Sequence, residues 1–161
     1  MDCYRVPKRR VSVRISLRNQ AEKAASIFVG DSAKSHSGPE RPSDVMNDDA
    51  VFFAVEADGA VEFLPRHAVA FLAVATPLEF ELGTGADDDT IQLAITLDDG
   101  RCFEGMVRYR LPDFARRLQD FLNLGDRFLR LERADDVLLV NKGRIVSARE
   151  IRPGEERRGA D

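Results

Sequence analysis

Residues 41–55 read RPSDVMNDDAVFFAV, and residues 117–131 repeat the pattern as RLQDFLNLGDRFLRL. With a shift of 76 residues, identical residue types coincide at four places in these stretches: Arg41 and Arg117, Asp44 and Asp120, Asn47 and Asn123, and Phe52 and Phe128. The apolar positions agree more widely, and the agreement extends to residues 74 and 150. The sequence therefore predicts an internal duplication. These eight residues form its structural repeat motif, and both phenylalanines are expected in a core.

Strand-like alternation surrounds both copies of the motif. Residues 10–18, RVSVRISLR, place an apolar residue at every second position, which is typical of a half-buried strand. Residues 91–97, IQLAITL, alternate in the same way, and DDG at residues 98–100 predicts a hairpin turn before the return strand. Apolar residues spaced by three and four between residues 111 and 122 predict a short helix that ends near Asn123. Three more strands follow in each copy.

The order of two strands, a short helix and three strands, written twice, predicts a mainly β protein. We expect two tandem five-stranded small barrels related by a pseudo-twofold axis, since closure hides the edges of a sheet. A unit of roughly 60 residues is marginal alone, so the copies are expected to share a core. The expected boundaries are a flexible tail at residues 1–9, the first barrel at 10–75, the second barrel at 91–152 and a flexible tail at 153–161. Residues 76–90 are expected to form an acidic linker with a bridging strand; it carries Glu79, Glu81, Asp87, Asp88 and Asp89 and no base.

The composition favours a folded cytoplasmic protein. The 161 residues are 43% hydrophobic and 32% charged, and no run of about 18 apolar residues predicts a membrane span. The N-terminus does not resemble a secretory signal. Cys3 and Cys102 match no metal or redox spacing, which suits a reducing compartment. The formal net charge of −4 gives no global basic field that would attract nucleic acid.

Residues 97–107, LDDGRCFEGMV, followed by residues 131–151, LERADDVLLVNKGRIVSAREI, resemble the Sm-like small β-barrel. The version with the inserted R-L-x-D-x-L-N is more similar to a bacterial domain family of unknown function. The resemblance covers residues 91–151 well and residues 10–74 loosely, and it implies an Sm-like or SH3-like barrel fold. In Sm-like proteins an Asp/Asn pair and a basic-Gly turn contact RNA, so it implies such contacts at Asp120, Asn123, Lys142 and Gly143. The first copy departs from this pattern, because Arg66 and His67 replace the Lys-Gly pair.

Two basic groups of residues are candidate ligand contacts. The second copy has a basic side, for which the candidate ligand or nucleic-acid contacts are Arg108, Arg110, Lys142, Gly143 and Arg144. The same residues also fit a solvated face that Asp113 and Asp126 balance. Arg10 and Arg14 have the R-x-x-x-R spacing of PilZ-type receptors for cyclic dinucleotides, whose paired guanidinium groups suit phosphates. The second motif of those receptors is missing downstream, and both arginines also fit a plain solvent-exposed strand face.

The sequence predicts no enzyme, no cofactor and no metal site. Neither His36 nor His67 has a recognisable nucleophile or orienting acid near it in the sequence, and no cluster of residues has metal-ligand spacing. Arg117 and Asp120, three residues apart, suit an ion pair on a helix surface.

We therefore expect a non-enzymatic interaction or regulatory module of a bacterial cytoplasm, which binds a protein partner through a barrel surface or an edge strand. Residues 78–82, LEFEL, and the apolar first copy are the candidates for that edge. The alternative is an RNA- or nucleotide-binding module, either Sm-like or PilZ-like. No membrane partner is expected, and a homo-oligomer remains open.

Overall fold

The computed structural model describes residues 8–18, 22–31, 33, 38–75, 89–109 and 118–152. The strands of the first half are β1 (Lys8–Leu17), β2 (Glu22–Gly30), β3 (Phe52–Ala57), β4 (Ala60–Pro65) and β5 (Val69–Ala75). Helix α1 (Pro42–Met46) precedes β3, and the short 3-10 helix η1 (Arg66–Ala68) precedes β5. The strands of the second half are β6 (Asp89–Leu97), β7 (Cys102–Tyr109), β8 (Phe128–Glu132), β9 (Asp136–Asn141) and β10 (Ile145–Ile151), with α3 (Leu118–Leu122) before β8 and η3 (Lys142–Arg144) before β10.

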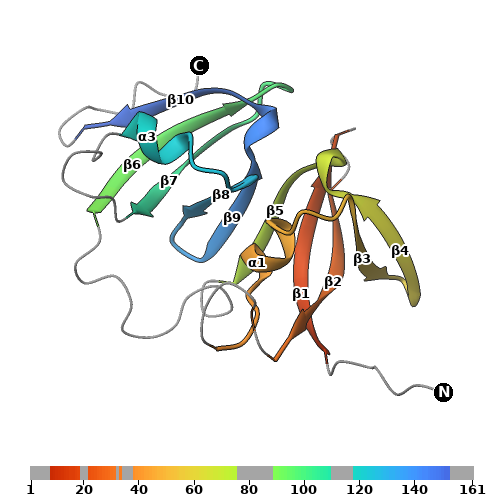
Figure 1. Cartoon of the computed structure of the whole chain (residues 1–161). Coiled ribbons are helices and arrows are strands. Elements are labelled where there is room, and N and C mark those ends of the chain that lie inside the picture. The colour runs from red at the N-terminus through yellow and green to blue at the C-terminus, as the bar shows by residue number, and fades with distance from the viewer. Residues whose placement is uncertain are drawn as a thin grey trace.

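All ten strands belong to one antiparallel sheet, which confirms the expectation of a mainly β protein. The strand order is β10-β6-β7-β8-β9-β5-β1-β2-β3-β4, so that β10 and β4 are its two edges. Figure 1 shows the two halves side by side, with β5 and β9 adjacent between them. Among the described residues no ladder closes either half on itself, and the prediction of two closed barrels is not confirmed.

The two halves repeat one strand order, fifth-first-second-third-fourth. Their registers also match: Ile15 of β1 lies opposite Leu72 of β5, and Ile95 of β6 lies opposite Ala148 of β10. Each of these ladders carries a register shift at the same place, between Ser16 and Leu17 in the first half and just after Ile145 in the second. Shifts of 76 and 80 residues therefore link residues that occupy equivalent places in the two halves.

Strands β5 and β9 form a seam that belongs to two hydrophobic clusters at once. Alternate residues of both strands point to opposite faces of the sheet, as in any strand. Val69, Leu72 and Val74 of β5 join the cluster that fills the first half, while Ala70 and Phe71 join the cluster of the second half. Strand β9 divides in the same way, with Val137 and Leu139 in the first cluster and Leu138 and Val140 in the second. Both strands are consequently buried on both faces, and the two halves share their interior.

The prediction that Phe52 and Phe128 both lie in the core is wrong for Phe52. Phe128 is 2% exposed, whereas Phe52 is 58% exposed. The cause is the environment of each half. Phe128 lies on β8, next to the seam strand β9, and packs into the first cluster. Phe52 stands beside β4, which is an edge strand of the sheet among the described residues. Its neighbour Phe53 is the residue that points into the core.

The turns and the helix agree with their sequence signals where the structure describes them. Gly100 of the DDG turn has a φ of 87°, and Asp58 and Gly59 of the β3–β4 hairpin have φ values of 52° and 78°. These positive values are typical of tight hairpin turns. Helix α3 ends at Leu122, and the next residue, Asn123, donates from its Nδ2 to the Gln119 carbonyl oxygen at 2.9 Å. The predicted start of this helix at residue 111, both tails and most of the linker, including LEFEL, lie outside the described residues.

Two expected boundaries move by a few residues. Strand β1 begins at Lys8, inside the predicted tail, and β6 begins at Asp89, inside the predicted linker. Within the part of the chain that the structure describes, no helix has the length and apolar character needed to cross a membrane.

Candidate functional site

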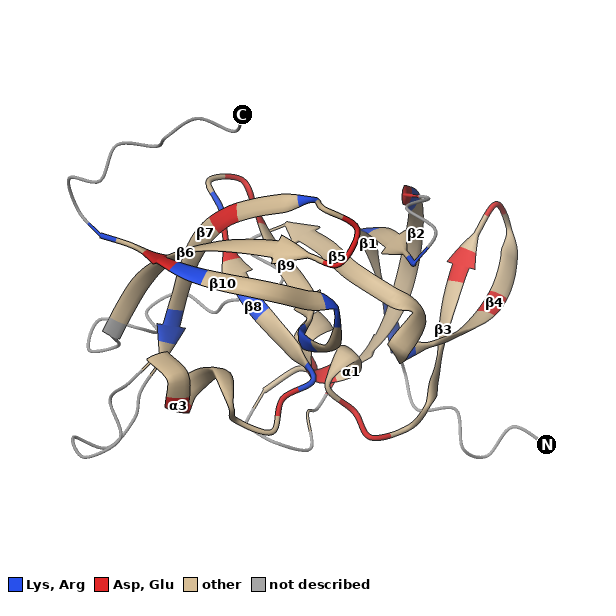
Figure 2. Cartoon of the chain, turned by 90° about the horizontal axis from the view of Figure 1, so that it is seen from above, with Lys and Arg blue, Asp and Glu red and all other residues tan. Residues whose placement is uncertain are grey.

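The basic side predicted for the second half is largely engaged in internal contacts. Arg108 Nε donates to Glu132 Oε2 at 2.7 Å, which joins β7 to β8. Arg144 Nη1 donates to Asp98 Oδ2 at 2.8 Å, which joins η3 to the β6–β7 turn. Figure 2 shows acidic and basic residues interspersed along both halves. Arg110 lies outside the described residues. These contacts favour the view of this side as a charge-balanced solvated face.

Lys142 fixes a loop of its own half. Its Nζ donates to the Leu124 carbonyl oxygen at 3.2 Å, and its backbone N–H donates to the Arg127 carbonyl oxygen at 2.9 Å. Burial lowers the pKa of Lys142, and the nearby Asp126 carboxylate opposes that shift. The ammonium group thus helps to fix the loop between α3 and β8.

Arg66, the equivalent of Lys142 in the first half, has the same role with more bonds. Its guanidinium is almost completely buried and donates to the carbonyl oxygens of Val45, Ala50 and Phe52. Its backbone N–H donates to the Val51 carbonyl oxygen at 2.8 Å, as that of Lys142 does to Arg127. Burial also lowers the pKa of Arg66. In both halves, the basic residue after the fourth strand therefore stabilises the loop between the short helix and the third strand by donating hydrogen bonds to its carbonyl oxygens.

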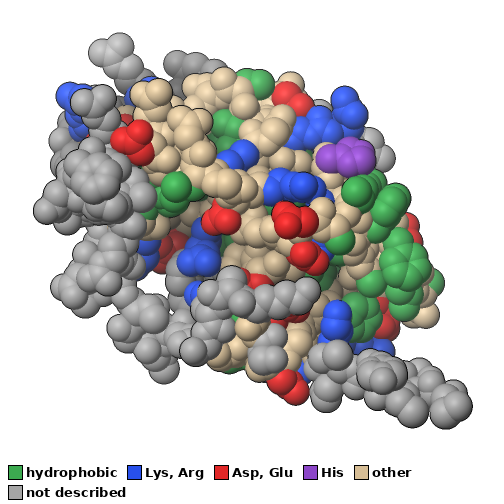
Figure 3. Space-filling view, in the orientation of Figure 1, with side chains coloured by type: hydrophobic (Ala, Val, Ile, Leu, Met, Phe, Trp, Pro, Cys, Tyr) green, Lys and Arg blue, Asp and Glu red, His purple; other side chains and the backbone are tan. Residues whose placement is uncertain are grey.

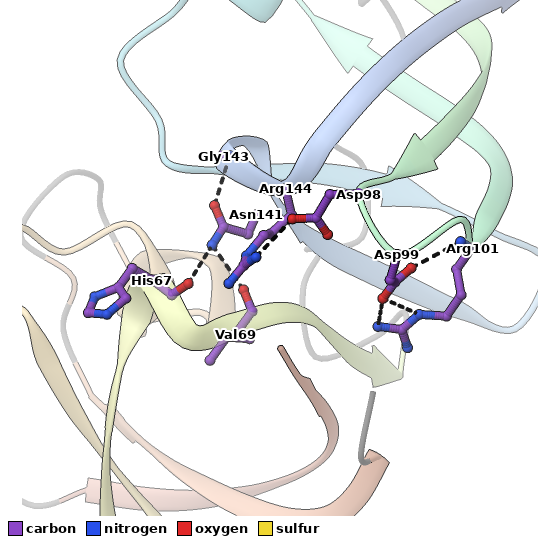
Figure 4. Close-up of polar contacts among 8 residues, drawn as sticks. All are labelled: His67, Val69, Asp98, Asp99, Arg101, Asn141, Gly143 and Arg144. Carbon is purple, nitrogen blue, oxygen red and sulfur yellow. Dashed lines mark hydrogen bonds and ion pairs between the residues drawn. The ribbon is translucent and has the colours of Figure 1, made fainter. Parts of the chain in front are cut away.

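Asn141 locks the turn before β10 to the seam. Its Oδ1 accepts from the Gly143 backbone N–H at 2.9 Å, and its Nδ2 donates to the Val69 carbonyl oxygen at 2.9 Å, with a longer bond to the His67 carbonyl oxygen. Figure 4 shows these bonds beside the Arg144–Asp98 pair. A side chain at Gly143 would meet Asn141 Oδ1 at 3.3 Å. This close approach is a local structural reason for a glycine at position 143. No local sequence pattern points to Asn141.

Arg101 makes a second contact between the two halves, which no local sequence pattern indicates. It follows the DDG turn, and its Nη1 donates to Ser16 Oγ of β1 at 2.6 Å. Its guanidinium lies over the Phe71 ring of β5, 5.0 Å from the centroid, while Asp99 Oδ2 accepts from its Nε and Nη2. The side-chain hydrogen bond from Arg101 lowers the pKa of Asp99. Ser16, on the polar side of an alternating strand, is buried for this reason.

A basic hollow lies at the junction of the two halves. It has a volume of about 590 Å³ and is lined by Arg18, His67, Asp98, Arg127, Asn141, Lys142, Gly143 and Arg144. The consecutive residues Lys142, Gly143 and Arg144 line this hollow together with two arginines from elsewhere in the chain, Arg18 and Arg127. Arg108 lies instead at another hollow, of about 250 Å³, beside Tyr109 and Phe121.

Arg10 and Arg14 both meet carboxylates on the exposed face of β1. Arg10 Nη2 lies 3.1 Å from Glu56 Oε2, and Arg14 pairs with Glu22 at 3.5 Å and with Asp136 at 3.2 Å. The pKa of Asp136 is lowered, first by its hydrogen bond from Arg133 and then by the charges of Arg133 and Arg14. The contact between Arg14 and Asp136 crosses the seam, from β1 to the start of β9.

The repeat motif has structural roles where it is described. The Arg41 backbone N–H donates to Asp44 Oδ2 at 2.7 Å, and Asp44 thereby caps the start of α1. Asn47 ends α1, and its Oδ1 accepts from the Phe128 backbone N–H at 2.8 Å, across the seam. Asp120 is exposed on α3, and Arg117 lies outside the described residues.

An exposed apolar patch, formed by Phe52, Val61 and Phe63, covers β3 and the edge strand β4. Val61 is 54% exposed and Phe63 is 69% exposed, and the adjoining Val51 is exposed as well. Figure 3 shows hydrophobic side chains gathered at this side of the molecule, below the purple histidine. Exposed apolar residues that are grouped in this way often mark an interaction surface.

The edge of β4 also offers unpaired backbone groups. The β3–β4 hairpin closes on Ala57 and Ala60, and its register places Val61 opposite Glu56 and Phe63 opposite Ala54. Hydrogen-bonded and non-hydrogen-bonded pairs alternate along an antiparallel ladder, starting from a bonded pair at such a turn. The N–H and C=O groups of Val61 and Phe63 therefore point away from β3, toward the open edge.

The described residues contain no group of three or more His, Cys, Asp or Glu side chains that could hold a metal ion. Cys102 has a free, exposed thiol. Comparisons with protein-family models, with curated proteins and with solved structures find no match to this chain.

Proposed function

We propose that this chain is a non-enzymatic interaction module, built from two duplicated small β-barrel units, that binds a protein partner at the β4 edge. The observation that carries the proposal is the exposed apolar patch of Phe52, Val61 and Phe63 on an edge strand. An extended segment can add to such an edge, because backbone hydrogen bonds supply affinity and alternate side chains supply specificity.

The matching halves support the duplication. Strand order, register and the position of the register shift all agree between residues 8–75 and residues 89–151. A coincidence of all three would be unusual for unrelated five-stranded units. In this proposal the units are small barrels that opened toward each other to share β5 and β9.

The internal bonds of the basic residues support an interaction surface elsewhere. Lys142, Arg66 and Arg144 stabilise turns, and Arg10 and Arg14 meet carboxylates. The apolar patch has no comparable internal role, since its side chains extend into solvent.

The test is a comparison of captured proteins. The tagged full chain, its Phe63→Lys variant and the matched control Gln92→Lys, which adds the same charge to an exposed position on β6, are used as baits. We expect a protein, identified by mass spectrometry, that the parent and the control retain and the Phe63→Lys variant loses. A set of captured proteins that is the same for all three baits would contradict the proposal.

A second candidate function is binding of RNA or nucleotide phosphates in the basic hollow at the junction. The observation in its favour is that Arg18, Arg127, Lys142 and Arg144 surround one concave region against a single acid, Asp98. Phosphate binding by these groups must weaken steeply with salt, with a log–log slope of about −0.7 per contact on single strands.

This alternative is tested with Arg18→Glu and Arg127→Glu together, because Lys142 and Arg144 also hold the fold. Micromolar RNA binding at about 150 mM salt that the double variant loses would favour it. The chain has two Tyr and no Trp, so co-purified nucleic acid would stand out in its absorbance at 260 nm.

A further inference from the structure

We infer that the partner of the β4 edge is a second copy of this chain, whose β10 pairs with β4 and extends the sheet from molecule to molecule. This inference rests on the proposed function and names its partner. The two edges of the sheet, β4 and β10, are the fourth strand of the first half and the fifth strand of the second. A fourth and a fifth strand already pair once inside the molecule, as β9 and β5.

The pairing of β5 with β9 inside the molecule provides the geometry for the proposed pairing of β10 with β4 between molecules. In the seam, Leu72 of β5 lies opposite Leu139 of β9, and Val74 lies opposite Val137. Each β5 residue corresponds to the β10 residue 76 positions later, and each β9 residue to the β4 residue 76 positions earlier. The equivalent pairs between molecules are therefore Ala148 opposite Phe63 and Glu150 opposite Val61. The backbones of β4 and β9 sit in matching hairpins, with β3 and β8, so the same antiparallel ladder can form between two molecules.

The exposed patch on β3 and β4 consists of residues whose equivalents in the second half are buried by packing against the first half. Phe128, Val137 and Leu139 are buried in the first cluster, against residues of the first half. Their equivalents in the first half are Phe52, Val61 and Phe63, which are all more than half exposed. The first half thus presents the same surface as the second but has no neighbouring half to cover it.

The charges on the strands favour pairing of β4 with β10 of a second molecule over pairing with β4 of a second molecule. The seam pairs Ala73 with Leu138, and the 76-residue shift places Arg149 of β10 opposite Glu62 of β4. Opposite charges stabilise a directly opposed cross-strand pair, and like charges destabilise it. If two β4 strands paired antiparallel with Val61 opposite Phe63, Glu62 would face Glu62. Lys23, which donates to Glu62 at 2.5 Å in the single chain, would remain beside the new pair.

The turn after each short helix adds a second contact. Asn47 follows α1, and its side chain accepts from the Phe128 backbone N–H across the seam. Asn123 follows α3 at the equivalent position of the second half, and Phe52 is the equivalent of Phe128. In the assembly, Asn123 of one molecule would accept from the Phe52 N–H of the next.

Such an interface is head-to-tail, because it joins two different surfaces of identical molecules. Interfaces of this kind generate closed rings when the rotation between neighbours closes, and filaments when it does not. The small side chain of Ala148 leaves room for the Phe63 ring opposite it. The assembly is therefore expected to exceed a single chain in mass and to depend on concentration.

The test uses two full-length variants that each block one edge. Phe63→Lys blocks β4 and leaves β10 intact, whereas Arg149→Glu blocks β10 by placing a negative charge opposite Glu62. Ser12→Lys and Lys8→Glu, at exposed positions on β1 inside the sheet, are the matched controls. Circular dichroism and urea unfolding confirm that each variant is folded, and Val61→Lys replaces Phe63→Lys if that variant is not. Masses are measured by analytical ultracentrifugation from about 1 μM to about 1 mM.

We expect the parent chain and both controls to assemble, and each blocked variant to associate at least about tenfold more weakly. An equimolar mixture of the two blocked variants should form a 1:1 dimer, because one supplies an intact β10 and the other an intact β4. An assembly that Arg149→Glu leaves unchanged, or a mixture that stays monomeric, would overturn the inference. A parent chain that is monomeric at all concentrations would also overturn it, and the proposed function would survive only if the bait comparison still identified a different protein at the same edge.

Discussion

Arg66 and Lys142 close the same loop in the two halves by donating to backbone carbonyl oxygens. Arg66 reaches three carbonyls because its planar guanidinium carries several donors in a fixed geometry, whereas the Lys142 ammonium reaches one. Both groups lie partly or fully out of water, and burial lowers the pKa of each. At the residue scale, a basic residue at a turn is thus an internal stabiliser here, although its position alone is also typical of a phosphate contact.

Phe52 and Phe128 make a matched pair for a first prediction. Phe128→Ala should lower the free energy of unfolding by about 3–5 kcal/mol, since it removes a buried ring from the first cluster. Phe52→Ala should change it by less than about 0.5 kcal/mol in the single chain, because most of its side chain is exposed. Urea unfolding of the two variants under dilute conditions measures both values. Equal losses of stability would show that the two rings have like environments.

The seam of β5 and β9 is the element on which both halves depend. Each strand places residues into both the first and the second cluster, and further side chains bridge the seam on either side: Arg14 to Asp136, Arg101 to Ser16, Asn141 to Val69 and Asn47 to Phe128. The polar contacts surround the apolar seam, so the two halves are held together by buried area and by directional bonds.

One of these contacts predicts a dependence of stability on pH. The pKa of Asp136 is lowered, chiefly by its hydrogen bond from Arg133 and also by Arg14 across the seam. A lowered pKa means that the ionised carboxylate stabilises the folded chain above the ordinary aspartate value of about 3.9, and that this contribution is lost as the pH falls toward the lower folded value. Asp136→Asn should therefore reduce stability by a constant amount near neutral pH.

The difference between the parent chain and Asp136→Asn should shrink below about pH 4, where the parent also loses the charge. Guanidinium unfolding at a series of pH values measures it. Asp120→Asn, at an exposed position on α3, serves as the control for the exchange of a carboxylate for an amide. If the difference in the free energy of unfolding stays the same down to pH 2, the charge of Asp136 does not contribute to stability.

For the molecule as a whole, the shared seam predicts that neither half is independent. Residues 89–161 produced alone would expose Phe128, Val137 and Leu139 together with the open edge of β9. Units of this size bury only about 60% of their unfolded surface and are marginal even when intact. We expect this fragment to self-associate or to unfold without cooperativity, as judged by sedimentation and urea unfolding. A monomer with a sharp transition would contradict the dependence.

Much of the fold was predictable because it is local. Alternation in residues 10–18 and 91–97 places Val11, Val13 and Ile95 inward, and the structure agrees. The seam was not predictable, although β5 reads as an unbroken apolar run, because such a run indicates burial on both faces without naming the neighbour. The exposure of Phe52 was missed for the same reason, since a repeat equates positions and not their surroundings. The roles of Arg101 and Asn141 depend on contacts with the other half, which no local pattern records.

The order in which the chain is made gives the seam a further consequence. Strand β5 ends at Ala75, and its partner β9 begins only at Asp136, about 60 residues later. At translation rates of about 5–20 residues per second, the ribosome needs roughly 3–12 s to produce that partner. For those seconds the nascent first half displays β5, an apolar strand with a free edge, in the crowded space near the exit tunnel. Slow synthesis of residues 76–135, for instance at rare codons, should therefore lower the yield of folded protein more than an equal delay after residue 141.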